Sequence, residues 1–359
     1  MIYLDYQATT PLAPEARDAM LPWLGGAETV GFANPHSPHR PGRAAAAAIE
    51  VARQQVAALL PPGGRVIFTG SATEALNLAI FGSGAKRLAV SAIEHAAVLD
   101  TARAASSCVT LLPVNTNGLV DAAAAIPQGS DLVAVMQVNN EIGTVQPVNE
   151  LAEASHRAGA LFLCDAVQGA GKISYPEGAD LVALSAHKLY GPKGIGALWV
   201  RDGVTLSPLM YGGGQEQGLR SGTLSPALCA GFGAAAKLAL ERAEADMQHV
   251  ASLWSIAREI LSRWTLNGSA EARWPGNMNV RLEGVDVARL MSDLRDLAFS
   301  AGSACASGSG RPSHVLTALG LSPHEAKSSI RLGFGRYSRL REIEDACARI
   351  NAAAAAQGV

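Results

Sequence analysis

Short apolar segments alternate with helical segments through the first two-thirds of the chain, and this alternation restricts the fold more than any other feature. Segments that are apolar on both faces are typical of strands in a parallel sheet whose two sides are covered. Helices between such strands supply the crossovers of an α/β fold. The predicted strands are 65–69, 88–91, 131–138, 160–165, 181–185 and 196–200, and the predicted helices are 73–81, 95–105 and 148–158. The sequence therefore predicts a mainly parallel sheet covered by helices.

The pattern changes near Ser225-Pro226, where a long helical stretch replaces the alternation. A predicted strand at 278–282 and a predicted helix at 287–294 follow this stretch. A chain of 359 residues has the length of about two domains. We therefore expect a large domain over 15–226 and a smaller α+β domain formed by 1–14 together with 227–359.

The composition is that of a soluble globular protein, with 17% charged residues and a formal net charge of −2. Because the sequence has no basic run, its charge supports neither nucleic-acid binding nor attachment to a membrane surface. It shows no secretory signal pattern and no apolar stretch long enough to span a membrane. The five cysteines lie far apart, without the spacing of a metal site or a disulfide framework. We expect a cytoplasmic protein without a metal, whose thiols stay reduced.

Polar residues gather where the predicted strands end. These clusters occupy 69–73, 94–95, 139–141, 165–168 and 185–188. In an open parallel sheet, ligands bind outside the carboxyl ends of the strands. The five clusters are therefore expected to meet in one crevice.

Two of these clusters carry groups suited to an aldehyde cofactor with a pyridine ring. Desolvation at a strand end favours the neutral amine of Lys188, and a neutral amine can form a Schiff base. A buried Asp165 carboxylate needs a cation, which a pyridinium nitrogen would supply, and Gln168 could donate to the phenolic oxygen of the same ring. The alternatives are a surface lysine at a strand end and an aspartate that caps a helix.

The remaining clusters fit the same cofactor. The segment 69–74 opens a helix, whose first N–H groups and dipole favour an anion, although it could be an ordinary capped helix. No Walker or dinucleotide-binding motif is present, which disfavours nucleotide cofactors. His95 could stack on a flat ring and move protons, or could simply cap a helix. Asn140 could donate to a ring or substrate oxygen, or could be a turn residue.

Cys305 lies in the segment SAGSACASGSG, among small residues and glycines. Such a composition is typical of a mobile loop, on which a thiol could enter a site, react and leave. The alternative is a buried, inert cysteine. Together, the amine, the buried acid, the anion site and the histidine predict a pyridoxal phosphate site.

These residues belong to a series of motifs in one order along nearly the whole chain. The motifs are YLDYQATTP (3–11), FANP (32–35), ATE (72–74), EH (94–95), VNNEIG (138–143), DAVQ (165–168), SAHK (185–188), RSGT (220–223), SAC (303–305) and SSIR (328–331). The series resembles the cysteine desulfurases, class V pyridoxal phosphate enzymes of the fold-type I aminotransferase group. The resemblance implies a fold-type I enzyme with pyridoxal 5'-phosphate as its cofactor.

The resemblance also implies a role for each matching residue. Lys188, Cys305 and His95 would be catalytic, with Lys188 bound to the cofactor, His95 stacked on its ring and Cys305 accepting sulfur as a persulfide. Asn34, Asn140 and Arg331 would face the substrate, with Arg331 clamping its carboxylate. Thr223 would reach the phosphate in the neighbouring subunit of a homodimer. The implied cofactor-binding residues are Ala72, Thr73, His95, Asn140, Asp165, Gln168, Ser185, His187, Lys188 and Thr223.

The implied reaction converts L-cysteine to L-alanine and passes the sulfur through Cys305 to an acceptor protein, such as an iron–sulfur scaffold. Thiolation of tRNA and cofactor biosynthesis are equally open destinations for the sulfur. A selenocysteine lyase or an aminotransferase on the same fold is the alternative, and an aminotransferase would not need Cys305. A non-catalytic scaffold is disfavoured, because it has no reason to keep Lys188, Asp165 and His95 together.

Overall fold

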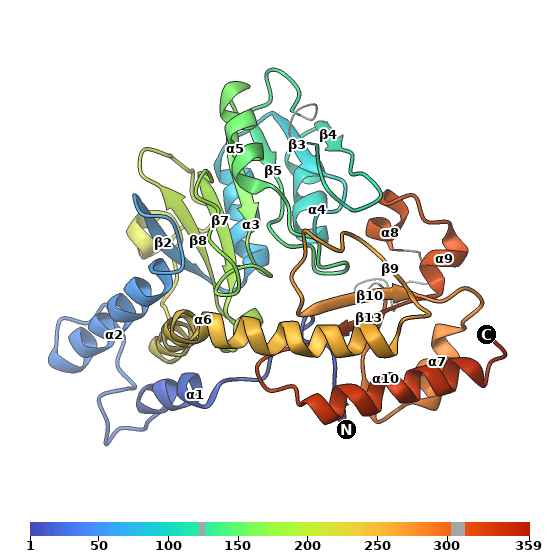
Figure 1. The fold of residues 1–359 in the computed structure, drawn as a ribbon. Helices are drawn as coiled ribbons and strands as arrows, with labels where there is room; N and C mark the ends of the chain where they lie inside the picture. Colours follow the sequence, from blue (N-terminus) through green and yellow to red (C-terminus); the bar gives the residue numbers. More distant parts are fainter. Residues whose placement is uncertain (122–125, 303–312) are drawn as a thin grey trace.

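The computed structural model describes residues 1–121, 126–302 and 313–359. Within them, seven strands form the central sheet in the order β2-β8-β7-β6-β5-β3-β4 (Figure 1). Their bounds are β2 (Gly64–Thr69), β3 (Arg87–Ser91), β4 (Cys108–Leu112), β5 (Leu132–Ala134), β6 (Leu161–Asp165), β7 (Leu181–Ser185) and β8 (Gly196–Arg201).

The strands of the central sheet run mainly in parallel, which confirms the predicted α/β fold. β3 pairs in parallel with β4 and β5, β5 with β6, and β6 with β7. β8 is antiparallel to both β7 and β2, so β2 points in the same direction as β7. The carboxyl ends of β2, β3, β5, β6 and β7 therefore lie at one edge of the sheet, where ligands bind in folds of this class.

Helices cover both faces of this sheet. On one face, α3 (Ala72–Gly82) and α4 (Ala96–Ala105) pack against strand residues such as Ile67. On the other face, α2 (Arg40–Ala57), α5 (Val148–Arg157) and the first half of α6 (Pro226–Ile260) bury residues such as Phe68. α1 (Pro14–Met20) packs against α6. Neighbouring strand residues point to opposite faces, so strands that are apolar throughout pack against a layer of helices on each face of the sheet.

A smaller sheet lies beside the first, in the order β12-β13-β10-β9. Helices pack on it around a second core that includes Trp264, Met278 and Leu332. The N-terminal strand β1 pairs in parallel with β11, which brings the start of the chain into this region. The bounds are β1 (Ile2–Tyr3), β9 (Thr265–Leu266), β10 (Asn277–Arg281), α7 (Val287–Asp293), β11 (Leu297–Ala298), β12 (Ser300–Ala301), α8 (His314–Ala318), α9 (Pro323–Lys327), β13 (Ser329–Gly333) and α10 (Leu340–Ala355).

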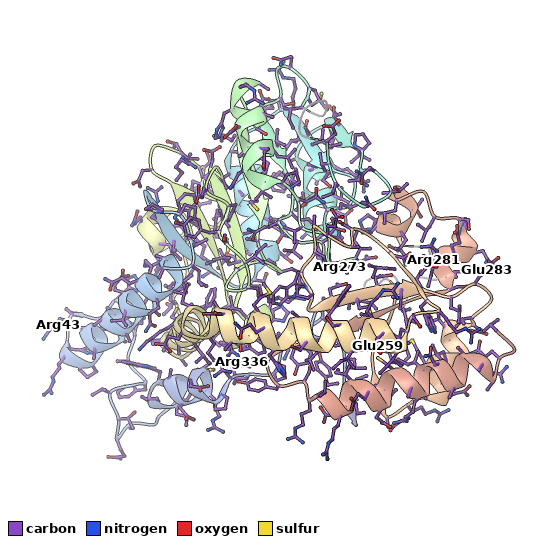
Figure 2. All side chains as sticks on the ribbon, viewed as in Figure 1. Arg43, Glu259, Arg273, Arg281, Glu283 and Arg336 are labelled. Atoms are coloured by element: carbon purple, nitrogen blue, oxygen red, sulfur yellow. The ribbon has the colours of Figure 1, made fainter. Side chains whose placement is uncertain are left out.

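The helix α6 extends beneath both sheets without interruption (Figure 1). Its first half adds Phe232 to the core of the central sheet, and its second half adds Leu253 to the second core. Arg336, which follows β13, lies beside this helix (Figure 2) and pairs with Asp246 at 2.7 Å. Since α6 contributes to both cores, the domain limits at 226 and 227 stay a prediction.

In the central sheet, two strands differ from the prediction. β5 is shorter than the predicted strand 131–138, because the N–H of Met136 donates to the Glu94 carboxylate at 2.7 Å instead of continuing the ladder with β3. β4 is an edge strand whose residues are mostly exposed, so no apolar run predicts it. Among the helices of the described residues, none is long and apolar enough to cross a membrane.

Candidate active site

A cavity of ≈ 350 Å³ opens at the carboxyl edge of the central sheet, a size suited to a small cofactor and its substrate. The clusters at the strand ends meet around it, as the sequence predicts. The predicted site residues that line it are Ala72, Thr73, His95, Asn140, Asp165, Gln168, Ser185, His187, Lys188 and Arg331. Its other lining residues are Gln7, Ala8, Ser71, Leu76, Ala97, Met136, Val138 and Val167.

Lys188 follows β7 and brings its amine into this cavity. The amine donates hydrogen bonds to the carbonyl oxygens of Gln7 and Ala8, at 2.5 and 2.8 Å. The N-terminal segment is fixed there because Thr10 also bonds to the backbone of His187, at 2.9 Å. Gln7 and Ala8 were not among the predicted site residues, although they lie in the motif at 3–11.

Asp165 ends β6 and is buried. Its Oδ1 accepts a hydrogen bond from the N–H of Val167 at 3.0 Å. Burial raises the pKa of Asp165, and this hydrogen bond, with the nearby His95 and Lys188, opposes the rise. A protonated ring nitrogen would supply the positive charge that a buried carboxylate needs. Asp165 therefore fits the pyridinium contact predicted for it.

The first turn of α3 forms an anion site at the wall of the cavity. Ser71 caps the helix, its Oγ accepting from the N–H of Glu74 at 3.2 Å. Ala72 and Thr73 are the first helical residues, so their N–H groups have no partner within the helix and favour an anion. Gly196 of β8 makes room for this turn, because a Cβ there would lie 2.5 Å from the carbonyl carbon of Ser71.

His187 precedes Lys188 in the turn at the end of β7. Its Nδ1 lies 3.1 Å from Oγ1 of Thr9. Burial, with a further contribution from the charges of nearby lysines, lowers the pKa of His187 to about 4. The imidazole is therefore neutral at physiological pH, and it would contact a phosphate as a hydrogen-bond donor and not as a cation.

His95 caps α4, as one of the two interpretations of the sequence anticipates, and it also lines the cavity. Its Nδ1 accepts a hydrogen bond from the N–H of Ala97 at 3.0 Å. In the neutral ring, the proton is therefore assigned to Nε2. The cap fixes the orientation of the ring, so the two interpretations are compatible.

Arg331 of β13 is buried at the cavity, with its side chain 1% exposed. Its Nη2 pairs with Asp5 at 2.7 Å, and its Nη1 donates to the carbonyl oxygen of Asn140 at 3.0 Å. Its Nε has no hydrogen-bond partner among the described residues. Asp5 was not a predicted site residue, but it balances the charge of a guanidinium that still has a donor to offer.

Three predicted residues are not placed in this cavity. Asn34 is exposed ahead of α2, and Thr223 is exposed ahead of α6. The segment of Thr223 is attached to the anion site, because Arg220 pairs with Glu74 of α3 at 2.7 Å. Cys305 lies outside the described residues.

Comparison with known proteins places the chain in a family. The model of the aminotransferase class-V family matches residues 2–345. Cysteine desulfurase IscS from Rickettsia bellii is 41% identical over 98% of this chain and 91% of that protein. The mitochondrial cysteine desulfurase of Arthroderma benhamiae is 44% identical, over 96% of this chain and 72% of that protein. The X-ray structure of a NifS-like protein from Rickettsia africae is 30% identical, covers 98% of this chain and 99% of that one, and has a TM-score of 0.88.

The fold, the cavity and these similarities define a pyridoxal phosphate-dependent enzyme of fold type I. The chain belongs to the aminotransferase class-V family. The residues present fit the cofactor, since a buried carboxylate, an anion-binding helix terminus and a lysine amine surround one cavity. They match the ring nitrogen, the phosphate and the aldehyde, respectively.

Proposed function

We propose that the protein is a cysteine desulfurase, which converts L-cysteine to L-alanine and passes the sulfur to Cys305 as a persulfide. The observation that carries the proposal is the cavity in which Lys188, Asp165, His95 and the first turn of α3 converge. The relatives named cysteine desulfurase support the choice of substrate, at 41% and 44% identity over almost the whole chain.

Lys188 serves first as the attachment point and then as the base. Bound pyridoxal phosphate supplies a ring that withdraws electrons from the substrate and acidifies its Cα–H bond. Lys188 would be the group that takes this proton, because its amine lies in the same cavity. The carbonyl oxygens of Gln7 and Ala8 hold the released amine, at 2.5 and 2.8 Å, so it stays at the cavity wall.

The side chains around the cavity orient the substrate and handle its protons. Arg331 binds the substrate carboxylate through donors that Asp5 and Asn140 do not use. His95 exchanges a proton through Nε2, because its Nδ1 is occupied by the N–H of Ala97. Asn140, in the turn that follows β5, faces the substrate.

Cys305 accepts the sulfur by nucleophilic attack. Its thiolate attacks the sulfur of the bound cysteine, so an S–S bond forms while the C–S bond breaks. The electron pair of that bond stays on the carbon skeleton, which takes up a proton and leaves as alanine. A thiol reductant or an acceptor protein then removes the outer sulfur and restores the Cys305 thiol.

The functional unit is a homodimer in which Thr223 reaches the phosphate in the other subunit and Asn34 faces the substrate. The exposure of both residues supports this arrangement, because neither lines the cavity of its own chain. Large apolar side chains are exposed near both residues: Phe32, just before Asn34, is 61% exposed, and Tyr211, beside the Met210–Arg220 bridge that precedes Thr223, is 83% exposed. The dimer acts in the cytoplasm and delivers sulfur to an acceptor protein, for which an iron–sulfur scaffold is one candidate.

Reconstitution with pyridoxal phosphate tests the proposal. The protein should turn yellow, and reduction with borohydride should fix the cofactor on Lys188, as peptide mass spectrometry would show. Lys188→Ala should take up cofactor without this attachment. With L-cysteine and a thiol reductant, the loaded wild type should release alanine and sulfide in equal amounts. A loaded protein that exchanges amino groups with a keto acid instead would be an aminotransferase, and the proposed activity would be wrong.

A further inference from the structure

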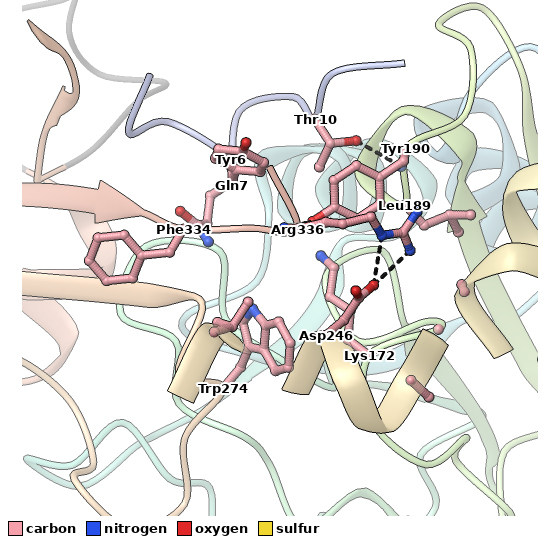
Figure 3. Close-up of a pocket in the computed structure, with 14 residues that line it drawn as sticks. Tyr6, Gln7, Thr10, Lys172, Leu189, Tyr190, Asp246, Trp274, Phe334 and Arg336 are labelled. Atoms are coloured by element: carbon pink, nitrogen blue, oxygen red, sulfur yellow. Dashed lines mark hydrogen bonds and ion pairs between the residues drawn. The ribbon is translucent and has the colours of Figure 1, made fainter. Parts of the chain in front are cut away.

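Lys172 lies behind the active-site cavity, in the segment that follows the DAVQ motif. Its amine is 3.5 Å from Oε1 of Gln168, which lines the cavity. Lys172 lines a second, smaller cavity of ≈ 20 Å³. Figure 3 shows Lys172, Gln7, Trp274 and the pair of Asp246 and Arg336 around this space. Lys172 therefore has direct contact with a site residue but none with the cavity in which the cofactor fits.

The amine of Lys172 has no carboxylate partner among the described residues. Asp246 lines the same small cavity, but its Oδ2 accepts from both Nε and Nη2 of Arg336, at 2.7 Å each. The ring of Trp274 lies 6.0 Å from the amine. Burial, and to a lesser degree the charge of Lys188, lower the pKa of Lys172 to about 7. An amine in this setting destabilises the fold, and among the described residues its contacts with Gln168 and Trp274 offset part of that cost.

This contact and a hydrogen bond to Gln7 favour the same orientation of the Gln168 amide. A lysine amine is a donor towards a side-chain amide, so Oε1 of Gln168 faces Lys172. The amide nitrogen then faces the other way, where it donates to the carbonyl oxygen of Gln7 at 2.9 Å. Lys188 donates to the same carbonyl oxygen, at 2.5 Å. The second N–H of Gln168 is left for the cavity.

We propose that Lys172 is a positioning residue, which holds the Gln168 amide with its oxygen inward and its nitrogen toward the phenolic oxygen of the bound cofactor. The inference rests on the proposed function, because only a bound pyridoxal cofactor gives that N–H an acceptor. Without Lys172, one of the two contacts that orient the amide is lost, and the turned amide, which would present an oxygen to the cofactor oxygen, becomes more accessible. A hydrogen bond from an amine also polarises the amide and strengthens its N–H as a donor.

Lys172→Met tests the proposal, since methionine fills similar space without donating a hydrogen bond. The apoprotein should melt at a higher temperature than wild type, because a desolvated amine has been removed. Its affinity for pyridoxal phosphate should nevertheless fall roughly threefold to tenfold, the loss expected for one hydrogen bond. The absorbance spectrum of the bound cofactor should shift as well. Lys237→Met is the matched control, because that side chain is 61% exposed and should change neither property.

A double-mutant cycle with Gln168→Leu separates positioning from a general structural role. If Lys172 acts through Gln168, Lys172→Met should weaken cofactor binding in wild type but not in the Gln168→Leu background. Equal losses in both backgrounds, or an unchanged affinity and spectrum in Lys172→Met, would overturn the inference. Lys172→Arg keeps a donor and should retain the wild-type spectrum, which gives a second test if the methionine variant misfolds. Failure of the wild type itself to bind pyridoxal phosphate would instead overturn the proposed function.

Discussion

The pair of Asp5 and Arg331 leads to a quantitative prediction about substrate binding. The two side chains are 2.7 Å apart, and Asp5 is the carboxylate that balances the buried guanidinium when no substrate is present. A bound substrate would place a second carboxylate on the same guanidinium. Asp5→Asn removes the first negative charge, but its amide oxygen can still accept the hydrogen bond from Nη2. The Arg331 side chain should therefore keep its position, while the competition between the Asp5 carboxylate and the substrate carboxylate for its guanidinium is removed.

The size of the effect follows from Coulomb's law. Two carboxylates on one guanidinium are about 5 Å apart, which gives about 3 kcal/mol of repulsion at an effective dielectric constant of about 20. The side chain of Asp5 is 20% exposed, and solvent screening reduces this value. With about 1 to 2 kcal/mol remaining, ligand affinity should rise about fivefold to thirtyfold. The ligand-free variant should lose about 1 to 3 kcal/mol of stability, because a buried cation has lost its counter-charge.

Binding of L-alanine to the cofactor-loaded protein is the assay, followed by the change in absorbance. The product carries the same carboxylate as the substrate and avoids turnover. Urea denaturation of the same samples measures the stability. Asp18→Asn serves as a control, because Asp18 is 59% exposed and pairs with Arg17 at the surface. If Asp5→Asn binds L-alanine no better, or more weakly, than wild type, charge competition at Arg331 is not what sets the affinity.

Two further substitutions probe the buried surroundings of the site. Burial raises the pKa of Glu94 well above 4.5, so the folded state holds a proton that the unfolded state has lost, and stability falls as the pH rises from about 4.5. The free energy of unfolding of Glu94→Gln should therefore rise relative to that of wild type over this range, by at most about 1.4 kcal/mol per pH unit. Urea midpoints that differ from those of wild type by the same amount at every pH from 5 to 9 would contradict this. Gly196→Ala would place a Cβ 2.7 Å from the N of Ala72, so we expect a loss of about 1 to 3 kcal/mol and weaker phosphate binding. Gly26→Ala, with no atom within 4 Å of the added Cβ, is its control, and equal melting temperatures for the two would refute the argument.

The sequence predicts those parts of the fold that leave a local pattern. Strands such as β7 (Leu181–Ser185) are buried on both faces, and their continuous apolar runs predict both their positions and a parallel sheet. β4 is exposed at the edge and leaves no such run. The early end of β5 could not be predicted either, because it depends on the Glu94 carboxylate, which lies 42 positions away from Met136.

The same limit applies to the site. Residues at the strand ends, such as Asp165 and Lys188, could be predicted because their position in the sheet follows from the strand pattern. Their partners come from distant parts of the chain: Lys188 bonds to Gln7 across 181 positions, and Arg331 to Asp5 across 326. The spacing of residues along the sequence carries information about local structure alone, so contacts between distant segments become visible only in the folded chain. The motif at 3–11 marked this segment but did not assign roles to its residues.

The central claim is that the substrate sulfur moves to Cys305. The most direct test measures alanine released from L-cysteine, with a thiol reductant present, by wild type and by Cys305→Ala, each loaded with pyridoxal phosphate. We expect wild type to release alanine and Cys305→Ala to bind cofactor and substrate normally while releasing little. Equal alanine from both proteins would contradict the claim, because the sulfur would then leave without Cys305.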